Sequence, residues 1–119
     1  MDPVNLAAKF ALIAEQWAPK IIGRVDDYDV KIVKLEGEFV WHQHADADEL
    51  FLVVEGALTI ELRDGPVELA AGELFVVPRG TEHRPVAHAE CQVMLFERRG
   101  LVNTGDGAET ERTRAPEEL

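Results

Sequence analysis

The order of apolar and polar residues follows a helical period at the start of the chain and an extended period afterwards. In the first segment, apolar residues recur at intervals of four, three and four, which predicts one apolar stripe along an amphipathic helix. Asp2 is the expected N-cap, Pro3 the first helical residue and Pro19 the stop, so residues 1–19 are expected to form an N-terminal helix. The helix is expected to pack on the rest of the domain or on a second subunit. The stripe consists of Leu6, Phe10, Ile13 and Trp17.

From Lys20 onward, short runs rich in valine, isoleucine, leucine and phenylalanine alternate with turn residues, which is typical of an all-β protein. The stretch "RDGPV" predicts a tight hairpin, because Asp64 and Gly65 supply the positive φ values that a two-residue turn needs. Strands without intervening helices leave a sandwich or a barrel as the compact solutions. The expected strands are 21–25, 28–35, 39–42, 50–54, 57–63, 67–69, 74–77, 83–86 and 91–97.

The chain is expected to form a single domain. Its 119 residues, 46% of them hydrophobic, are enough for one packed core, and no linker or repeat marks a second domain. Residues 20–99 are therefore expected to form the barrel. Residues 100–119 lose the apolar alternation, so we expect a polar C-terminal tail that is ordered only where it drapes over the barrel.

Composition and charge narrow the range of partners. The net charge of -11, from 23 acidic and 12 basic residues, argues against binding to nucleic acid or to an anionic membrane. The sequence has neither an apolar run long enough to span a membrane nor the basic start of a signal peptide, so a cytoplasmic location is expected. Cys91 is the only cysteine, and its apolar neighbours indicate a buried, unreactive thiol.

Histidines and carboxylates lie directly beside apolar residues in the stretch "HQHADADELFLVVEG". Burying such groups is costly unless they are paired or coordinated. His42 and His44 are two residues apart, so on a strand they can face one ion together. A third ligand, Glu49 or Asp48, is expected at the start of the next strand. His83, which follows a Pro-Arg-Gly turn, is a further candidate.

These spacings resemble the two motifs of the cupin family. The first motif, glycine, His-x-His, glutamate and glycine, matches Gly37, His42, His44, Glu49 and Gly56, with a first gap one residue shorter than in the family. The second motif, glycine, Pro-x-Gly and histidine, matches Gly72, Pro78, Gly80 and His83. Ala87 stands where the family has asparagine. Neither departure removes a ligand, and the spacing to Gly56 favours Glu49 over Asp48.

The resemblance implies a small single-domain bacterial cupin with a jelly-roll β-barrel, of the kind described as similar to mannose-6-phosphate isomerase. It also implies that one divalent metal ion is bound by His42, His44, Glu49 and His83. Three imidazoles and a carboxylate suit Fe(II), Mn(II), Ni(II), Cu(II) or Zn(II), with coordination positions left open. The metal would supply the partner that a buried Glu49 otherwise lacks.

Such a site predicts a metal-dependent enzyme of the isomerase, lyase or dioxygenase type that acts on a small polar metabolite. An isomerase or lyase needs a base that does not bind the metal, and Tyr28, Glu61 and Glu97 are open alternatives. The alternative function is a non-catalytic cupin module that binds a sugar or a small acid. Arg79 and Arg84 flank the second motif and could hold an anionic group of the ligand.

The remaining charged residues near the motifs have simpler interpretations. Asp46 and Asp48 are expected near the cavity mouth or at the surface, and His88 matches no motif position and is expected at the surface. A barrel with an unpaired strand edge is expected to form a homodimer through its sheets, with the apolar helix stripe as a second contribution.

Overall fold

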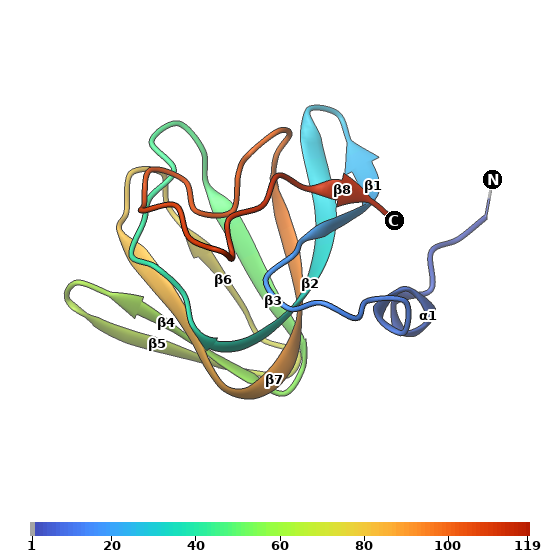
Figure 1. Cartoon of the computed structure of the whole chain (residues 1–119), viewed down its shortest axis with the longest axis horizontal. Coiled ribbons are helices and arrows are strands. Elements are labelled where there is room, and N and C mark those ends of the chain that lie inside the picture. The colour runs from blue at the N-terminus through green and yellow to red at the C-terminus, as the bar shows by residue number, and fades with distance from the viewer. Residues whose placement is uncertain (1) are drawn as a thin grey trace.

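The computed structural model describes residues 2–119, and nearly all of its regular structure is β-strand. Figure 1 shows the strands wrapped around a common core, with the only helix of these residues at the outer edge of the barrel. The all-β class expected from the sequence is confirmed. The elements are α1 (Leu6–Phe10), β1 (Lys20–Val25), β2 (Tyr28–Glu38), β3 (Glu49–Glu55), β4 (Ala57–Leu62), β5 (Gly65–Ala70), β6 (Leu74–Val77), β7 (His83–Arg98) and β8 (Glu117–Glu118).

The long strand β7 organises the barrel. Along one side it pairs antiparallel with β2. Along the other side its first residues pair with β4 and its last residues pair with β3. The pairing with β7 shifts register in β2 between Leu35 and Gly37 and in β3 between Val53 and Glu55, as at a β-bulge. Strand β7 joins the β4–β5 hairpin to the β3–β6 pair (Figure 1).

Alternating side chains of these strands fill the barrel. The pattern follows the two-residue period expected from the sequence, because successive side chains point to opposite faces of a strand. A smaller cluster of Phe10, Ile13 and Ile32 joins the N-terminal segment to the outer face of β2. The main core contains Trp17, Val33, Leu35, Phe39, Phe51, Val53, Leu58, Ile60, Leu69, Val77, Ala87, Cys91, Val93 and Leu95. Cys91 is buried, as expected, and burial raises the pKa of its thiol to about 11.

The predicted N-terminal helix is much shorter than expected. It covers only Leu6–Phe10, and its N-cap is Asn5, whose side chain accepts a hydrogen bond from the Ala8 amide at 2.9 Å. The predictions of Asp2 as the cap and of a helix reaching Trp17 were wrong. Trp17 has a φ of 61°, and its amide donates to Lys34 O at 2.9 Å. Pairing with the barrel therefore replaces the helical hydrogen bonds in the second half of the stripe.

Three strand predictions need correction. Residues 39–42 form no strand, and His42 makes a single bridge to His83. The two strands expected over 83–86 and 91–97 are one continuous strand, β7, which spans the expected break at His88 without interruption. The hairpin expected at "RDGPV" is present, but its loop is Arg63-Asp64, because Gly65 already pairs with Leu62.

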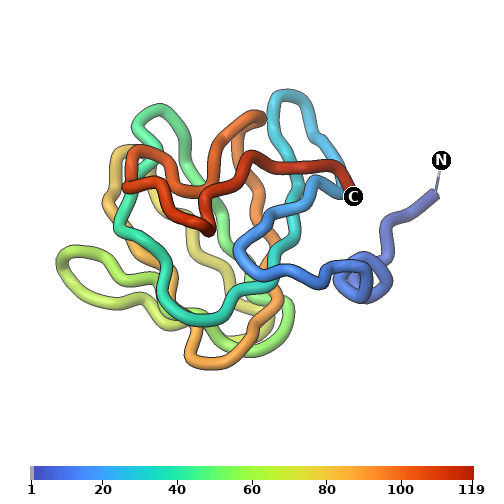
Figure 2. Tube along the Cα trace, in the orientation of Figure 1, coloured from blue at the N-terminus to red at the C-terminus, as the bar shows by residue number. Residues whose placement is uncertain are grey.

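The C-terminal segment, residues 100–119, drapes over the barrel and ends beside β1. Figure 2 shows it crossing the barrel end in red, and β8 pairs parallel with β1 at Lys20 and Ile21. The Asn103 side-chain amide donates to Trp17 O at 3.0 Å and to Arg112 O at 2.8 Å. These contacts attach the tail to Trp17 and to β1. Within residues 2–119, no helix is long and apolar enough to cross a membrane.

Candidate metal centre

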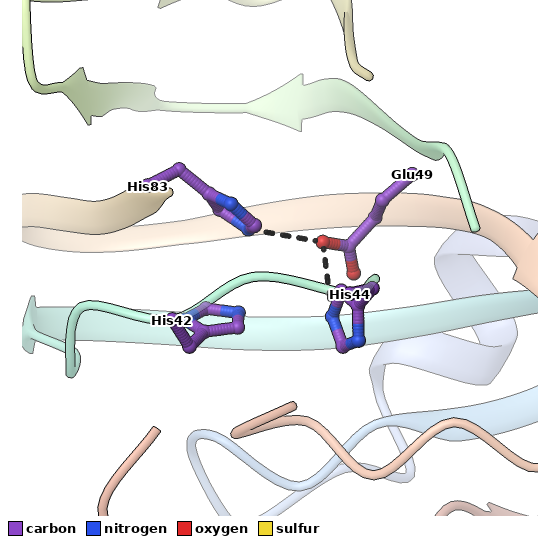
Figure 3. A group of neighbouring side chains, drawn as sticks. All are labelled: His42, His44, Glu49 and His83. Carbon is purple, nitrogen blue, oxygen red and sulfur yellow. Dashed lines mark hydrogen bonds and ion pairs between the residues drawn. The ribbon is translucent and has the colours of Figure 1, made fainter. Parts of the chain in front are cut away.

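Three parts of the fold bring the four implied ligands together inside the barrel. His42 and His44 lie on the segment between β2 and β3, Glu49 begins β3 and His83 begins β7. All four side chains are buried, and one ligand atom from each lies within 4.8 Å of the others. Figure 3 shows the three imidazoles and the carboxylate pointing toward one another. This cluster could hold one metal ion.

Backbone hydrogen bonds hold the two histidine segments side by side. The His42 amide donates to His83 O at 3.0 Å, and the His83 amide donates to His42 O at 2.9 Å. The Gly80 amide donates to His44 O at 2.9 Å. A short antiparallel pairing thus places both parts of the His-x-His motif against the second motif, although residues 39–42 form no strand.

Hydrogen bonds to carbonyls set the tautomers of two of the imidazoles. His42 Nδ1 lies 2.9 Å from Val40 O, and His83 Nδ1 lies 2.9 Å from Thr81 O. A carbonyl oxygen can only accept, so Nδ1 carries the proton in each ring and Nε2 keeps its lone pair. Metal-binding histidines commonly have this arrangement, in which a hydrogen bond from the other ring nitrogen orients the ligand.

The polar atoms at the centre of the cluster lack suitable donors. His83 Nε2 lies 3.3 Å and His44 Nε2 lies 3.6 Å from Glu49 Oε1 (Figure 3). Within residues 2–119, His44 Nε2 is buried without a hydrogen-bond partner. Two imidazole nitrogens around one carboxylate oxygen leave lone pairs facing each other, and a cation satisfies all of them at once. The residues therefore fit a divalent metal.

Burial disfavours the charged forms of the ligand side chains when no metal is bound. Burial lowers the pKa of His42 to about 3, and it lowers the pKa of His44 and of His83 as well. Burial raises the pKa of Glu49. Neutral imidazole is the form that binds metals, so the three rings are already in the coordinating form near neutral pH.

These tautomers and pKa shifts predict a measurable state of the metal-free protein. At about pH 5, below the ordinary histidine pKa of about 6.5, we expect the His42 ring to stay neutral with its proton on Nδ1. The folded pKa of about 3 lies below that pH, so the ring gains its second proton only on further acidification. Nitrogen-15 NMR of the imidazoles measures both properties. The urea-unfolded protein is the control, and a charged His42 ring at about pH 5 in the folded protein would contradict the assignment.

A buried ion pair lies beside the candidate ligands. Glu97 stands directly opposite Glu49 in the pairing of β3 with β7. Its Oε1 accepts from Lys31 Nζ at 2.8 Å, and both side chains are buried. Burial and the neighbouring Glu49 raise the pKa of Glu97 well above its ordinary value. Sequence reasoning considered Glu97 only as a base and missed Lys31. The strand period could have shown Lys31, because it puts this side chain on the same face as Val33 and Leu35.

The other two candidate bases lie apart from the cluster. The Tyr28 ring stacks on Phe96 with centroids 5.2 Å apart, on the face of the sheet opposite to Glu97. Glu61 binds Arg84, whose Nη2 lies 2.6 Å from its Oε1. Both side chains thus have structural partners of their own.

The remaining charged candidates lie at the surface. Asp48 Oδ1 accepts from the Arg79 amide at 2.8 Å and lies 3.3 Å from Arg79 Nε. Asp46 and His88 are exposed, as expected. Because Glu49 points into the barrel and Asp48 points away, the structure brings Glu49 to the histidines. Neither Arg79 nor Arg84 faces the cluster, since each is paired with a carboxylate elsewhere.

A loop of the C-terminal segment, residues 105–107, packs against the segment that carries His42 and His44. Asp106 Oδ1 accepts from the Gln43 amide at 2.8 Å. A side chain at Gly105 would begin 3.1 Å from the His44 ring, and one at Gly107 would begin 2.9 Å from His42 Cβ. The sequence predicted that the tail drapes over the barrel, but not these contacts with the histidines, because they depend on the path of the tail.

A small cavity adjoins the cluster on the side of His42 and Glu49. Its volume is about 30 Å³, which is space for about two water molecules. The strand residues of its wall include Val33, Leu35, Phe51 and Leu95. The rest of the wall includes Trp17, Phe39 and Asn103. We call this space the barrel cavity.

The β-barrel and the cluster of three histidines and one glutamate inside it match the arrangement expected of a cupin with a metal site. The chain belongs to the cupin family, because the family described as "Cupin domain" matches residues 30–97. It is 34% identical over 104 residues to the uncharacterized protein YdbB of Bacillus subtilis (strain 168), covering 78% of this chain and 92% of that protein.

Two solved structures show the same fold. A cupin-2 domain containing protein from Shewanella frigidimarina is 50% identical with a TM-score of 0.80, and the match covers 81% of this chain and 94% of that one. Protein NMB1881 from Neisseria meningitidis is 35% identical with a TM-score of 0.75, covering 82% of this chain and 99% of that one. These relatives establish a small single-domain cupin. The similarity to mannose-6-phosphate isomerase stays a prediction.

Proposed function

We propose that this protein binds one divalent transition metal through His42, His44, Glu49 and His83 and uses it to act on a small molecule. The observation that supports the proposal most directly is His44 Nε2, a buried nitrogen without a hydrogen-bond partner that faces the Glu49 carboxylate. The donor set suits Fe, Mn, Ni, Cu or Zn. When bound, such a metal polarises a substrate oxygen or activates water or dioxygen.

The protein's own residues would contribute orientation and exclusion of water. The carbonyls of Val40 and Thr81 hold the His42 and His83 rings with Nε2 free. The four ligand side chains are at most 7% exposed, so little bulk water contacts them. A dry site strengthens electrostatic interactions with a bound ligand.

The barrel cavity favours one of the three predicted reaction types. Of the residues that line it within 2–119, His42 and Glu49 are the only ionisable ones. An isomerase or lyase needs a base beside the ligands, and Tyr28 and Glu61 have other partners. Glu97 lies opposite Glu49, but Lys31 binds its carboxylate and it does not line the barrel cavity. A dioxygenase needs no such base, so this type is the first to test. The second candidate function, a module that binds a small molecule without turnover, is supported by the same lack of a base.

Elemental analysis tests the proposal. Protein purified without a chelating tag is expected to carry close to one transition metal ion per chain. The His42→Ala and His83→Ala variants are expected to lose it, because each removes one of four ligands. His88→Ala is the matched control, since His88 is exposed. A wild-type protein that holds no metal after reconstitution would contradict the proposal, as would alanine variants that keep a full load.

Partners and location are further parts of the proposal. A small-molecule ligand is typical of cupins, whereas homodimer formation and a cytoplasmic location stay predictions. Phe10 and Ile13 of the apolar stripe pack on the protein's own β2. The stripe is therefore largely used within the chain, and a second subunit would instead meet the exposed side chains of β6, Leu74 and Val76.

A further inference from the structure

We propose that the barrel cavity binds a small, uncharged and mostly apolar molecule, which reaches the metal through a single oxygen. This inference rests on the proposed function and specifies the substrate class of the same site. It differs from the polar metabolite expected from the sequence.

The wall of the cavity is apolar around its circumference. Val33, Leu35, Phe51 and Leu95 supply aliphatic and aromatic surface from β2, β3 and β7. The rings of Trp17 and Phe39 stack with centroids 4.7 Å apart and planes 6° apart. The rings of Phe39 and His42 are nearly perpendicular, with centroids 5.5 Å apart. A flat apolar ligand beside His42 would therefore contact aromatic and aliphatic surface.

The polar side chains of the wall outside the ligand cluster already form hydrogen bonds within the protein. The Asn103 side chain donates to Trp17 O and Arg112 O, and its oxygen accepts from the Arg114 amide at 2.7 Å. The Trp17 indole donates to Glu36 O at 2.9 Å. A sugar would lose the hydrogen bonds that its hydroxyls make to water and find no replacements in this wall.

The cavity also lacks a positive charge for an anionic group. No lysine or arginine lines it within residues 2–119. Lys31 is held by Glu97 at 2.8 Å, and Arg84 and Arg79 are paired at the surface. A phosphate or a second carboxylate on the ligand would be buried without a partner. Within the barrel cavity, one oxygen at the metal is therefore the polar anchor for the ligand.

A ring-sized ligand needs more space than the cavity contains. Its volume of about 30 Å³ holds about two waters. Most of the wall is built from paired strands, whereas Trp17 and Asn103 come from segments outside the barrel sheets. The Asn103 hydrogen bonds join these two segments. Binding of a ring-sized ligand therefore requires part of the wall to move.

Calorimetry on the Zn(II)-loaded protein tests the inference, because Zn(II) is redox-inert and the ligand stays intact. Phenol is the apolar probe with one oxygen, and gluconate is the polar, charged probe. We expect phenol to bind at least about ten-fold more tightly than gluconate, equivalent to about 1.4 kcal/mol. Equal or tighter binding of gluconate would overturn the inference and direct attention to the open groove on the His44 side, which Asp46, Arg98 and Asp106 line.

Variants separate the cavity from the metal site. Leu35→Phe and Leu95→Phe each enlarge a wall residue, and both are expected to weaken phenol binding about ten-fold or more while the zinc content stays at one per chain. Leu69→Phe is the matched control, since Leu69 belongs to the main core but does not line the cavity. Unchanged phenol affinity in both cavity variants would overturn the inference. Wild-type protein that takes up no zinc but still binds phenol would contradict the proposed function and the contact of the ligand oxygen with the metal, while the apolar cavity would stand.

Discussion

Loading the protein with a saturating divalent metal is expected to raise its free energy of unfolding by about 4 kcal/mol when the free metal is about 1,000 times its Kd. The reason is that the four ligands converge only in the folded barrel, so the unfolded chain binds the ion far more weakly. The gain includes a partner for His44 Nε2, which is buried without a hydrogen bond 3.6 Å from Glu49 Oε1. Urea unfolding with metal and with a chelator measures the difference.

Two variants control this measurement. His42→Ala is expected to abolish the stabilisation by metal, because it removes a ligand from the centre of the cluster. His88→Ala is expected to keep it, since this histidine is exposed on β7 and away from the site. Equal stability of the wild-type protein in metal and in chelator would mean that the histidines serve the fold alone.

Replacing Lys31 with methionine is expected to lower the free energy of unfolding by about 3 to 5 kcal/mol near neutral pH. Lys31 is the only cation within hydrogen-bond distance of the buried Glu97 carboxylate in the described part of the chain, and Glu97 stands opposite Glu49. Its removal leaves a buried carboxylate without its partner. Because a raised pKa allows Glu97 to be protonated, the loss is expected to shrink as the pH falls. Urea unfolding at two pH values measures it.

The second substitution in this pair distinguishes loss of charge balance from loss of packing. The double variant Lys31→Met with Glu97→Gln is expected to recover much of the lost stability, because no unpaired charge remains. Arg79→Met is the surface control, since its ion pair with Asp48 is exposed and should contribute little. A double variant no more stable than Lys31→Met would show that the methylene chain of Lys31, and not its charge, stabilises the barrel.

Much of the candidate site could be predicted from local sequence. The His-x-His spacing placed two imidazoles together, and the resemblance to the cupin motif, through its spacing from Glu49 to Gly56, favoured this carboxylate over Asp48. The structure turns Glu49 into the barrel and pairs Asp48 with Arg79 at the surface. Glu49 and Asp48 are neighbours on an extended segment, so the two-residue period forces them to opposite faces. That period is a local property, which is why the sequence could reveal it.

The helix prediction failed where tertiary contacts compete with local preference. The spacing of Phe10, Ile13 and Trp17 suits one helical face, and the first two residues do pack on β2. Trp17 instead enters the main core, donates its indole N–H to Glu36 O and adopts a positive φ. A helical period shows which apolar residues would share one face of a helix. It cannot show that one of them packs better in the barrel core.

The residue pattern by itself determined the all-β class and the pairing of His42 with His44, because each depends on a period of two. The choice of a barrel over a sandwich and the set of four ligands came from the resemblance to the cupin motifs. Only the tertiary structure decided the length of α1, the continuity of β7 and the path of the tail over the barrel. It also decided the pairing of Lys31 with Glu97, which lie 66 residues apart. Contacts of this kind depend on strand register and chain path, which local patterns do not encode.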